Sequence, residues 1–398
     1  MSSRDLVWLC TFLFYFSTIS LFDVQAHALK QTEERWEAFF PEGLRNYVRK
    51  TIELHGSVVG YYQQYANATV KDQGEKENFT ACISPQLVLA WKPTAQGTLH
   101  VRLRYTNNRV DLAQKGIVLA NLLETNVSNK DNGRIRLQEF YYSHKFDGDR
   151  AFVAFGKTDG ETFLDTNAFA NDSRTQFIGQ PVVNNPVLDD EDEYTPFIAF
   201  GGIPVKNLRL LAIVQSSSYP MNSHVEGKSV WEQLLKSPFV AVQATFSPRI
   251  EGHIGHYRLY GWLKSYDHPR LTTPGSENGW GMGISLDQLV TPQLGVFARL
   301  AYQNRHVYEA PWFWSAGTRF TGVIPGRESD IFGLAISGLR ANQETPNQGT
   351  EIHLETYYRI RLSKHFFISP DLQYVMNPLG NNDEAGIFAA TLRGEFRF

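Results

Sequence analysis

Acidic and basic side chains alternate with apolar ones in several segments, and this spacing makes them the first candidates for a functional role. If residues 351–362 are extended, Glu351, Glu355, Arg359 and Arg361 share one face, because side chains alternate along a strand. Interleaved carboxylates and guanidiniums can hydrogen-bond a hydroxyl-rich solute. They can equally brace a wall by pairing with one another. The same alternation adds three further charged residues to this set: Arg258, Arg393 and Glu395.

A second candidate region is the interval 158–196, which is too long for a simple turn. Loops of this length are usually functional or disordered. The interval mixes amides, carboxylates and an arginine with phenylalanines, which suits a solute with many hydroxyls and an apolar C–H face. We expect it to fold inward and narrow a pore; the alternative is an ordered surface loop with its own small core. The residues singled out here are Asp165, Asn167, Asn171 and Arg174, together with Lys157, which directly precedes the interval.

The sequence offers little support for catalysis or for a bound metal. The acidic run 189–193 could hold Ca²⁺, but no glycine-containing EF-hand pattern surrounds it, so a solvated loop is expected. HExxH, GxSxG, P-loop and CxxC motifs are absent from the sequence. Ser285 and His306 exist, but no pattern pairs them. We therefore predict no catalytic residue, no metal and no cofactor, and the net charge of −3 gives no reason to expect nucleic acid.

The elements that must position these side chains are long strands with a two-residue period. In residues 257–264, Leu259 and Leu263 alternate with Arg258 and Lys264. Other segments alternate in the same way over more residues than the five or six of a usual strand in a soluble protein. Tyrosines and tryptophans recur near the ends of such segments, among them Tyr61, Tyr141, Trp280, Trp312 and Tyr374, as at membrane interfaces. About sixteen segments are expected, centred near Val59, Leu89, Leu103, Phe140, Ala154, Phe200, Leu211, Val242, Leu259, Gly283, Ala298, Ala316, Ala335, Tyr357, Leu372 and Thr391.

An even number of such strands predicts an all-β fold, an antiparallel transmembrane β-barrel whose lumen holds water. Ahead of it, residues 1–28 have the features of a secretory signal peptide: Arg4, an apolar run, and small residues before position 29. We expect residues 29–52 to form a short amphipathic helix and residues 53–398 to form the barrel. Cys10 would leave with the signal peptide, so Cys82 would stand alone and no intrachain disulfide is expected.

Three stretches resemble the carbohydrate-selective porins of the OprB family. Residues 351–378, EIHLETYYRIRLSKHFFISPDLQYVMNP, are similar to the penultimate hairpin of that family. The sequence FGK at 155–157, followed by FLDTNAFAND at 163–172, resembles another family motif, and 279–304 is similar to its central hairpins. The terminal Phe398 matches the family's end. The resemblance spans roughly 54–398 and implies a sixteen-stranded outer-membrane barrel that admits sugars by diffusion.

The hypothesis is thus a passive, carbohydrate-selective porin of a bacterial outer membrane and not an enzyme. Its expected partners are small permeating sugars, outer-membrane lipid and the barrel assembly machinery, and the chain would act as a monomer or homotrimer. One alternative is a barrel enzyme such as a lipase or deacylase. Another is a surface glycan-binding barrel plugged by 29–52. Conductance would distinguish a porin from a plugged barrel, and lipid turnover would identify an enzyme.

Overall fold

The computed structural model describes residues 47, 50–68, 70–72, 75–107, 112–113, 115–124, 133–148, 150–189, 194–217, 234–342 and 348–398. Residues Leu54–Phe398 form one compact unit. The expected signal peptide, 1–28, and most of the expected amphipathic segment, 29–52, lie outside the described residues. Within the described part, no helix is long and apolar enough to cross a membrane.

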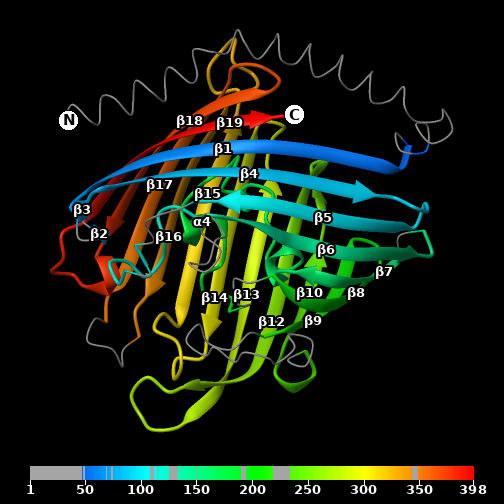
Figure 1. The fold of residues 1–398 in the computed structure, drawn as a ribbon, viewed down its shortest axis with the longest axis horizontal. Coiled ribbons are helices and arrows are strands. Elements are labelled where there is room, and N and C mark those ends of the chain that lie inside the picture. The colour runs from blue at the N-terminus through cyan, green and yellow to red at the C-terminus, as the bar shows by residue number, and fades with distance from the viewer. Residues whose placement is uncertain are drawn as a thin grey trace. The chain divides into compact units, whose positions relative to one another are not determined.

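Sixteen antiparallel strands close into a barrel, as the alternation predicted (Figure 1). Every one of the sixteen expected centres falls within a strand of the wall. The strands are β1 (Ile52–Ala66), β4 (Phe79–Trp91), β5 (Gly97–Thr106), β6 (Arg134–Phe146), β7 (Ala151–Thr158), β8 (Thr195–Val205), β9 (Leu208–Ser216), β10 (Pro238–Phe246), β12 (His253–Pro269), β13 (Ser276–Leu289), β14 (Leu294–Gln303), β15 (Trp312–Thr321), β16 (Ile331–Arg340), β17 (Thr350–Arg361), β18 (Phe366–Met376) and β19 (Ile387–Arg397).

The barrel closes because β1 pairs with β4 on one side and with β19 on the other. In the β1–β19 pair, Ser57 lies opposite Arg397 and Ala66 opposite Phe388. Three small strands lie outside the ring of sixteen: β2 (Val70–Asp72) pairs with β3 (Glu75–Glu77), and β11 (Arg249–Ile250) pairs with β12. Closure leaves the wall without a free strand edge.

The two faces of the wall differ in chemistry. On β12, Leu259 is 59% exposed on the outer face, whereas its neighbour Arg258 is buried on the inner face. On β17, Leu354 is exposed and Glu355 is buried. An apolar outer band around a polar interior is the arrangement of a membrane barrel.

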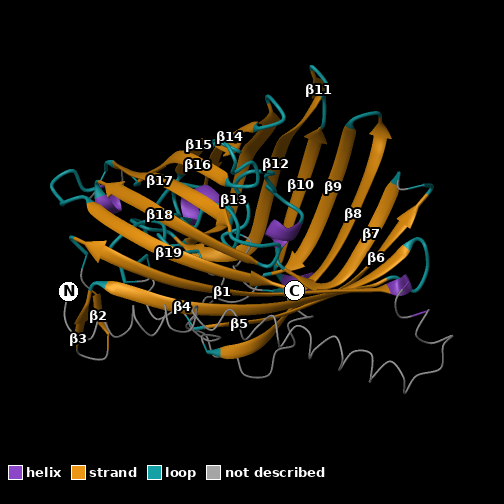
Figure 2. Cartoon of the chain, turned by 90° about the horizontal axis from the view of Figure 1, so that it is seen from above, coloured by secondary structure: helices purple, strands orange, loops and turns teal. Residues whose placement is uncertain are grey.

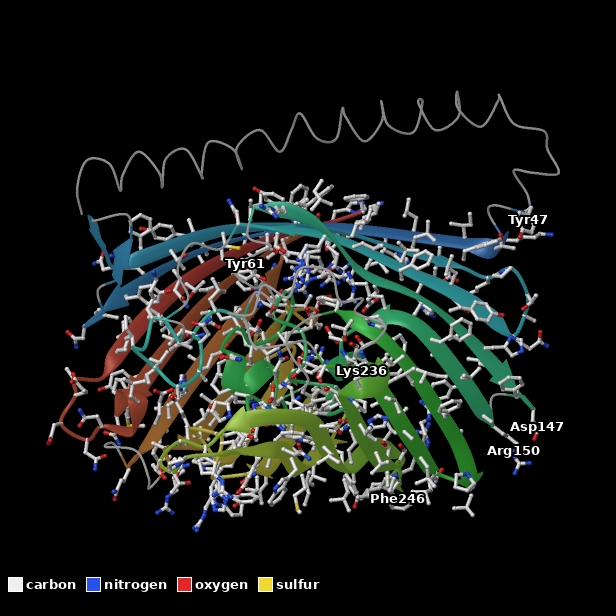
Figure 3. All side chains as sticks on the ribbon, turned by 60° about the horizontal axis from the view of Figure 1, so that its bottom comes forward. Tyr47, Tyr61, Asp147, Arg150, Lys236 and Phe246 are labelled. Atoms are coloured by element: carbon white, nitrogen blue, oxygen red, sulfur yellow. The ribbon has the colours of Figure 1, made fainter. Side chains whose placement is uncertain are left out.

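The aromatic residues divide between the two faces. Trp280, Trp312 and Tyr374 are exposed, as expected for residues at a membrane interface. Tyr61 and Tyr141 are buried, so assigning them to an interface was wrong. The hydroxyl of Tyr61 donates to the carbonyl of Ser173 inside the barrel, and Figure 3 labels its position. The two-residue period predicts that two faces exist, but a tyrosine is compatible with either one.

Connections between strands are short at one rim and long at the other. Short turns, such as 147–150 and 362–365, lie at the rim where β1 begins and β19 ends. Longer connections join the strands at the opposite rim, among them 159–194 between β7 and β8. Figure 2 shows that loops and a few short helical turns supply the remainder of the barrel unit.

Candidate functional site in the barrel interior

The long inner loop, residues 159–189, folds into the barrel as the sequence predicted for this interval. It contains the turns η2 (Gly160–Thr162) and α4 (Gln180–Val183). Its buried side chains Phe169, Phe177 and Val182 pack against wall residues, including Phe297 and Tyr357. The ring of Phe177 meets that of Tyr357 edge-on, with 4.9 Å between centroids. The loop therefore shares a hydrophobic core with the wall.

Two glutamates of β17 hold inner loops by their backbone. The carboxylate of Glu355 accepts hydrogen bonds from the amides of Ile178, at 2.5 Å, and Gly179, at 3.0 Å. Glu351 accepts from the amides of Leu119, at 2.7 Å, and Ala120, at 3.1 Å. Both glutamates face inward, but Glu351 is 0% and Glu355 2% exposed. They are covered by the loops and do not face open solvent.

Buried arginines hold the long inner loop through its carbonyls. Arg393 donates at 2.7 Å to the carbonyls of Ser173 and Gln176. Arg299, on β14, donates at 2.7 Å to the carbonyls of Val182 and Ala170. Arg299 is absent from the residues singled out by sequence. It is the single charge among the inward positions of residues 294–303, and this could have drawn attention to it.

A second segment, the short inner loop of residues 112–124, also lies inside the barrel and was not predicted. The carbonyl of Leu122 accepts from Gln373 at 2.9 Å. The amide of Glu124 donates at 2.7 Å to the carbonyl of Ile178, which joins the two inner loops. The interval between the expected strand centres at 103 and 140 is too long for a hairpin turn. The length of that interval could have indicated a second loop inside the barrel.

Asp165 and Asn167 attach the first part of the long inner loop to the wall. Asp165 forms an ion pair with Arg299, with 2.8 Å between Oδ2 and Nε, and has a positive φ of 52°. Burial raises the pKa of Asp165 above its usual value even beside this arginine. Asn167 donates at 3.2 Å to the carbonyl of Leu286, while Asn171 is exposed.

Asp189 attaches the other end of the same loop. Its carboxylate lies 2.8 Å from Nζ of Lys264 and accepts at 2.6 Å from the hydroxyl of Tyr308. Although burial alone would raise it, the pKa of Asp189 is held below its usual value by Lys264 and Tyr308. Asp189 is therefore paired, unlike the solvated residue expected for the acidic run. Residues 190–193 lie outside the described part of the chain.

Three of the remaining predicted charges, Arg258, Arg359 and Glu395, form ion pairs along the wall. Arg359 lies 2.6 Å from Glu395, which also contacts Arg397, so these three form a ladder. Arg258 lies 2.6 Å from Asp287, a partner that the sequence did not indicate. Arg361 is exposed at the end of β17.

Lys157 lies apart from the interior residues. In the ladder between β6 and β7 it is opposite Phe140, which is half exposed on the outer face. Residues directly opposite each other in a ladder share a face. The side chain of Lys157 therefore leaves the backbone on the outer face of the wall, whereas the sequence predicted a position in the pore. The motif at 155–157 suggested a lumen position, but the two-residue period puts Gly156 inward instead.

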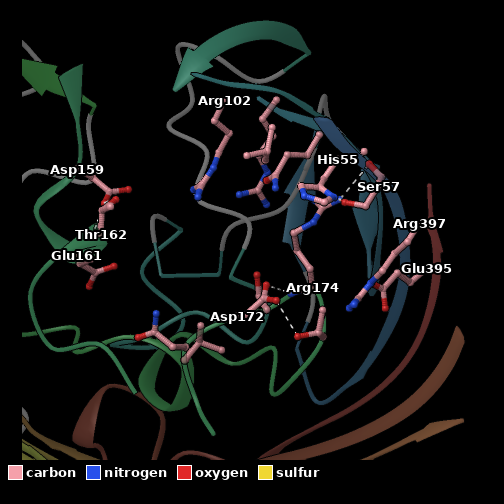
Figure 4. Close-up of a pocket in the computed structure, with 18 of the residues that line it drawn as sticks. His55, Ser57, Arg102, Asp159, Glu161, Thr162, Asp172, Arg174, Glu395 and Arg397 are labelled. Atoms are coloured by element: carbon pink, nitrogen blue, oxygen red, sulfur yellow. Dashed lines mark hydrogen bonds and ion pairs between the residues drawn. The ribbon is translucent and has the colours of Figure 1, made fainter. Parts of the chain in front are cut away.

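An opening remains between the long inner loop and the wall formed by β1, β4, β5 and β19 (Figure 4). It encloses about 620 Å³. Figure 4 shows Asp159 and Glu161 on one side and Ser57 and Arg174 on the other. The charged residues that surround the opening are Arg102, Arg104, Arg174, Arg397, Asp159, Glu161, Asp172 and Glu395. Of the residues singled out by sequence, Arg174, Asn171 and Glu395 belong to its lining.

The described residues show no grouping suited to metal binding and no link between the two catalytic candidates. No cluster of three or more His, Cys, Asp or Glu that could hold a metal ion occurs among them. Ser285 is buried against the long inner loop, where its hydroxyl lies 3.3 Å from the carbonyl of Thr166. His306 contacts Glu277 instead.

Comparison with known proteins gives matches in sequence and in fold. Residues 98–398 match the family described as "Carbohydrate-selective porin, OprB family". A stretch of 155 residues, 36% of the chain, is 28% identical to an uncharacterized protein of Synechocystis and covers 26% of that protein's length.

Two solved structures illustrate the similarity in fold. The high-pH structure of Pseudomonas putida OprB matches with a TM-score of 0.73 at 15% identity, covering 90% of this chain and 96% of that one. The outer membrane channel DcaP of Acinetobacter baumannii matches with a TM-score of 0.53 at 13% identity, covering 87% and 97%. At such identities the likeness concerns the fold of the barrel.

Proposed function

The chain belongs to the OprB family of carbohydrate-selective porins, and we propose that it lets sugars diffuse passively across the outer membrane through the opening beside the long inner loop. The observation that carries this proposal is a charged, polar opening inside the barrel, beside the long inner loop. A sixteen-stranded barrel has a wide lumen, so its wall alone would discriminate poorly among small solutes. The inner loops narrow the path.

Two groups of charged residues have different roles in this proposal. Arg102, Arg174 and Glu161 line the opening and contact the passing solute. Glu351, Glu355, Arg299 and Arg393 bind backbone groups of the inner loops and keep the opening in shape. Each hydrogen bond to a sugar hydroxyl would contribute only about 0.5–1.5 kcal/mol. Several weak contacts suit a channel, because a tightly held sugar would block it.

Export and membrane insertion complete the proposal. Residues 1–28 act as a cleaved signal peptide, which follows from their n-region and apolar run. Lipid covers the apolar outer face, where side chains such as Leu259 are exposed. The assembly machinery recognises the end of β19, including Phe398. The purified protein would then need detergent and keep its β-structure in it.

The test is a planar-bilayer recording with sugars added to the wild-type protein. We expect ion conductance with partial block by sugars at millimolar concentration. Replacing residues 168–182 by a short Gly-Ser linker keeps Asp165 and Asp189 in place, removes the obstruction and should raise conductance. It should also erase differences among sugars.

A matched control shortens the exposed connection 381–385 in the same way and should change neither property. A wild-type protein without conductance would contradict the proposal. Wild-type sugar preference in the linker variant would place the constriction elsewhere.

A further inference from the structure

Two buried arginines of the opening share one serine. Nε of Arg104, on β5, and Nη1 of Arg174, in the long inner loop, donate to Oγ of Ser84 at 2.9 and 3.0 Å. The two guanidiniums therefore lie close together. Arg104 is 6% exposed and Arg174 7%. Two like charges in a poorly solvated place repel each other, so this arrangement requires compensation.

The hydrogen-bond partners of the pair are neutral oxygens. Nη2 of Arg174 donates to Oγ of Ser57 at 2.8 Å and to the carbonyl of Ser84 at 2.9 Å. Nη2 of Arg104 is buried without a hydrogen-bond partner in the described part of the chain. Neither arginine forms an ion pair with a carboxylate among the described residues. Burial, and then the charge of Arg104, lower the pKa of Arg174 to about 10.

The carboxylates around the opening are already engaged. Glu395 contacts Arg359 and Arg397. Asp172 accepts at 2.7 Å from the hydroxyl of Thr175, and Asp159 accepts at 2.9 Å from the amide of Thr162. The fourth carboxylate, that of Glu161, also interacts within the chain. Arg102, the arginine next to the pair on β5, is paired with Glu139 at 3.1 Å. The opening thus keeps two cations whose charge is not matched by a contacting anion.

We propose that Arg104 and Arg174 form a binding site for an oxyanion carried by the permeating sugar, so that sugars bearing a phosphate or a carboxylate are preferred over neutral ones. This rests on the proposed function and names the substrate class of the same opening. Guanidinium groups offer paired N–H donors that fit the oxygens of either anion, and hydrogen bonds between charged groups are the strong ones. The unpartnered Nη2 of Arg104 is the donor left for this anion.

The test measures current block in planar bilayers by glucose, glucuronate, glucose 6-phosphate and inorganic phosphate. We expect the two anionic sugars to half-block the wild-type channel at a concentration about tenfold or more below that of glucose, as hydrogen bonds between charged groups imply. The variants Arg104→Gln and Arg174→Gln should each lose this preference, so that the anionic sugars and glucose then block at concentrations within about twofold of each other. Arg150→Gln removes an equal charge at an exposed turn and should keep the preference (Figure 3).

The outcomes separate this inference from the proposed function. Glucose and anionic sugars that block the wild type equally would overturn the inference and leave a sugar channel. Phosphate alone binding as tightly as glucose 6-phosphate would also overturn it, because the site would then hold an inorganic anion. A wild type blocked by no solute would contradict the proposed function itself. Single-channel recordings report on inserted barrels only, so a low yield of a variant does not affect the comparison. If a glutamine variant fails to insert at all, Arg104→Lys is measured in its place. Because this variant retains the charge, it should keep much of the preference for anionic sugars.

Discussion

Arg299 illustrates how one buried side chain in the wall positions a loop that is distant in sequence. It binds two carbonyls of the long inner loop and forms an ion pair with Asp165. A buried charge that loses its partner is strongly destabilising, because water no longer solvates it. Burial raises the pKa of Asp165, and the charge of Arg299 opposes this shift.

Arg299→Met should therefore destabilise the barrel by roughly 3–5 kcal/mol and loosen the long inner loop. The measurement is urea unfolding in lipid, followed by tryptophan fluorescence. Adding Asp165→Asn to this variant should recover part of the loss, because the unpaired charge disappears. The conservative outer-face change Leu300→Ile serves as the control. If Arg299→Met unfolds at the same urea concentration as the wild type, the contacts of Arg299 with the long inner loop do not contribute to the stability of the barrel.

At this scale the sequence predicted faces better than partners. The two-residue period put Glu351, Glu355 and Arg393 on the charged faces of their strands, and in the structure these faces point inward. Their partners are backbone groups of the inner loops, which no periodicity describes. The charges were expected beside a solute, yet these three hold the loops in place.

The long inner loop is an element held at both ends and in the middle. Asp165 anchors it near β7, Asp189 near β8, and Glu355 binds its centre at Ile178 and Gly179. An element without long regular structure depends on such contacts for its shape. The anchors therefore set the width of the opening.

Glu355→Leu should leave two amides, those of Ile178 and Gly179, without their acceptor. An unsatisfied buried amide costs about 1–3 kcal/mol, so the centre of the loop should detach while the strands persist. We expect higher and noisier conductance. Leu354→Ile, on the outer face of the same strand, provides the comparison and should conduct like the wild type. Quiet, wild-type currents from Glu355→Leu would show that the loop keeps its place without this contact.

The anchor at Asp189 should respond to acid in a defined direction. Its pKa is lowered in the folded protein, so its contribution to stability is present above the ordinary aspartate value of about 3.9 and is lost as the pH falls through the folded value. Wild-type conductance should hold steady from pH 7 to about 4 and rise below that.

Asp189→Asn should show the raised conductance already at pH 7. Lys264→Met, which removes the partner, should behave similarly. Flat conductance down to pH 2.5 in all three proteins would refute the anchor. At this element scale, the length of the interval 158–196 and its mixture of polar and aromatic residues predicted that it enters the barrel. The short inner loop has no motif and went unrecognised, because its contacts, such as that of Leu122 with Gln373, join distant parts of the chain.

The whole molecule is a ring whose closure joins β1 and β19. The backbone of Phe398 exchanges two hydrogen bonds of 3.0 Å with Gly56, and its ring occupies the space that a side chain at position 56 would need. Alternation and length together predicted the ring and all sixteen strands. The close approach at Gly56 could not be predicted, since it depends on which strand ends meet.

Gly56→Leu should lower the yield of folded barrel, because the new side chain would displace the ring of Phe398 from the closure. The measurement is the fraction of protein that migrates as the compact form in unheated gels. Phe398→Ala should lower the yield as well, through loss of the contact between Phe398 and Phe396. Gly252→Ala, at a turn with no nearby atoms but a positive φ of 83°, controls for loss of a glycine. Full yield from Gly56→Leu would contradict the role of this contact.

The pairing of β1 with β19 also bears on biogenesis. Until β19 pairs with β1, the sheet is an open ribbon with two unsatisfied edges. Both inner loops join strands at the rim opposite the start of β1, so each can fold inward through the mouth of the barrel at that rim. Ring closure fixes the circumference into which these loops must fit, so closure of the wall and packing of its contents are coupled steps of assembly.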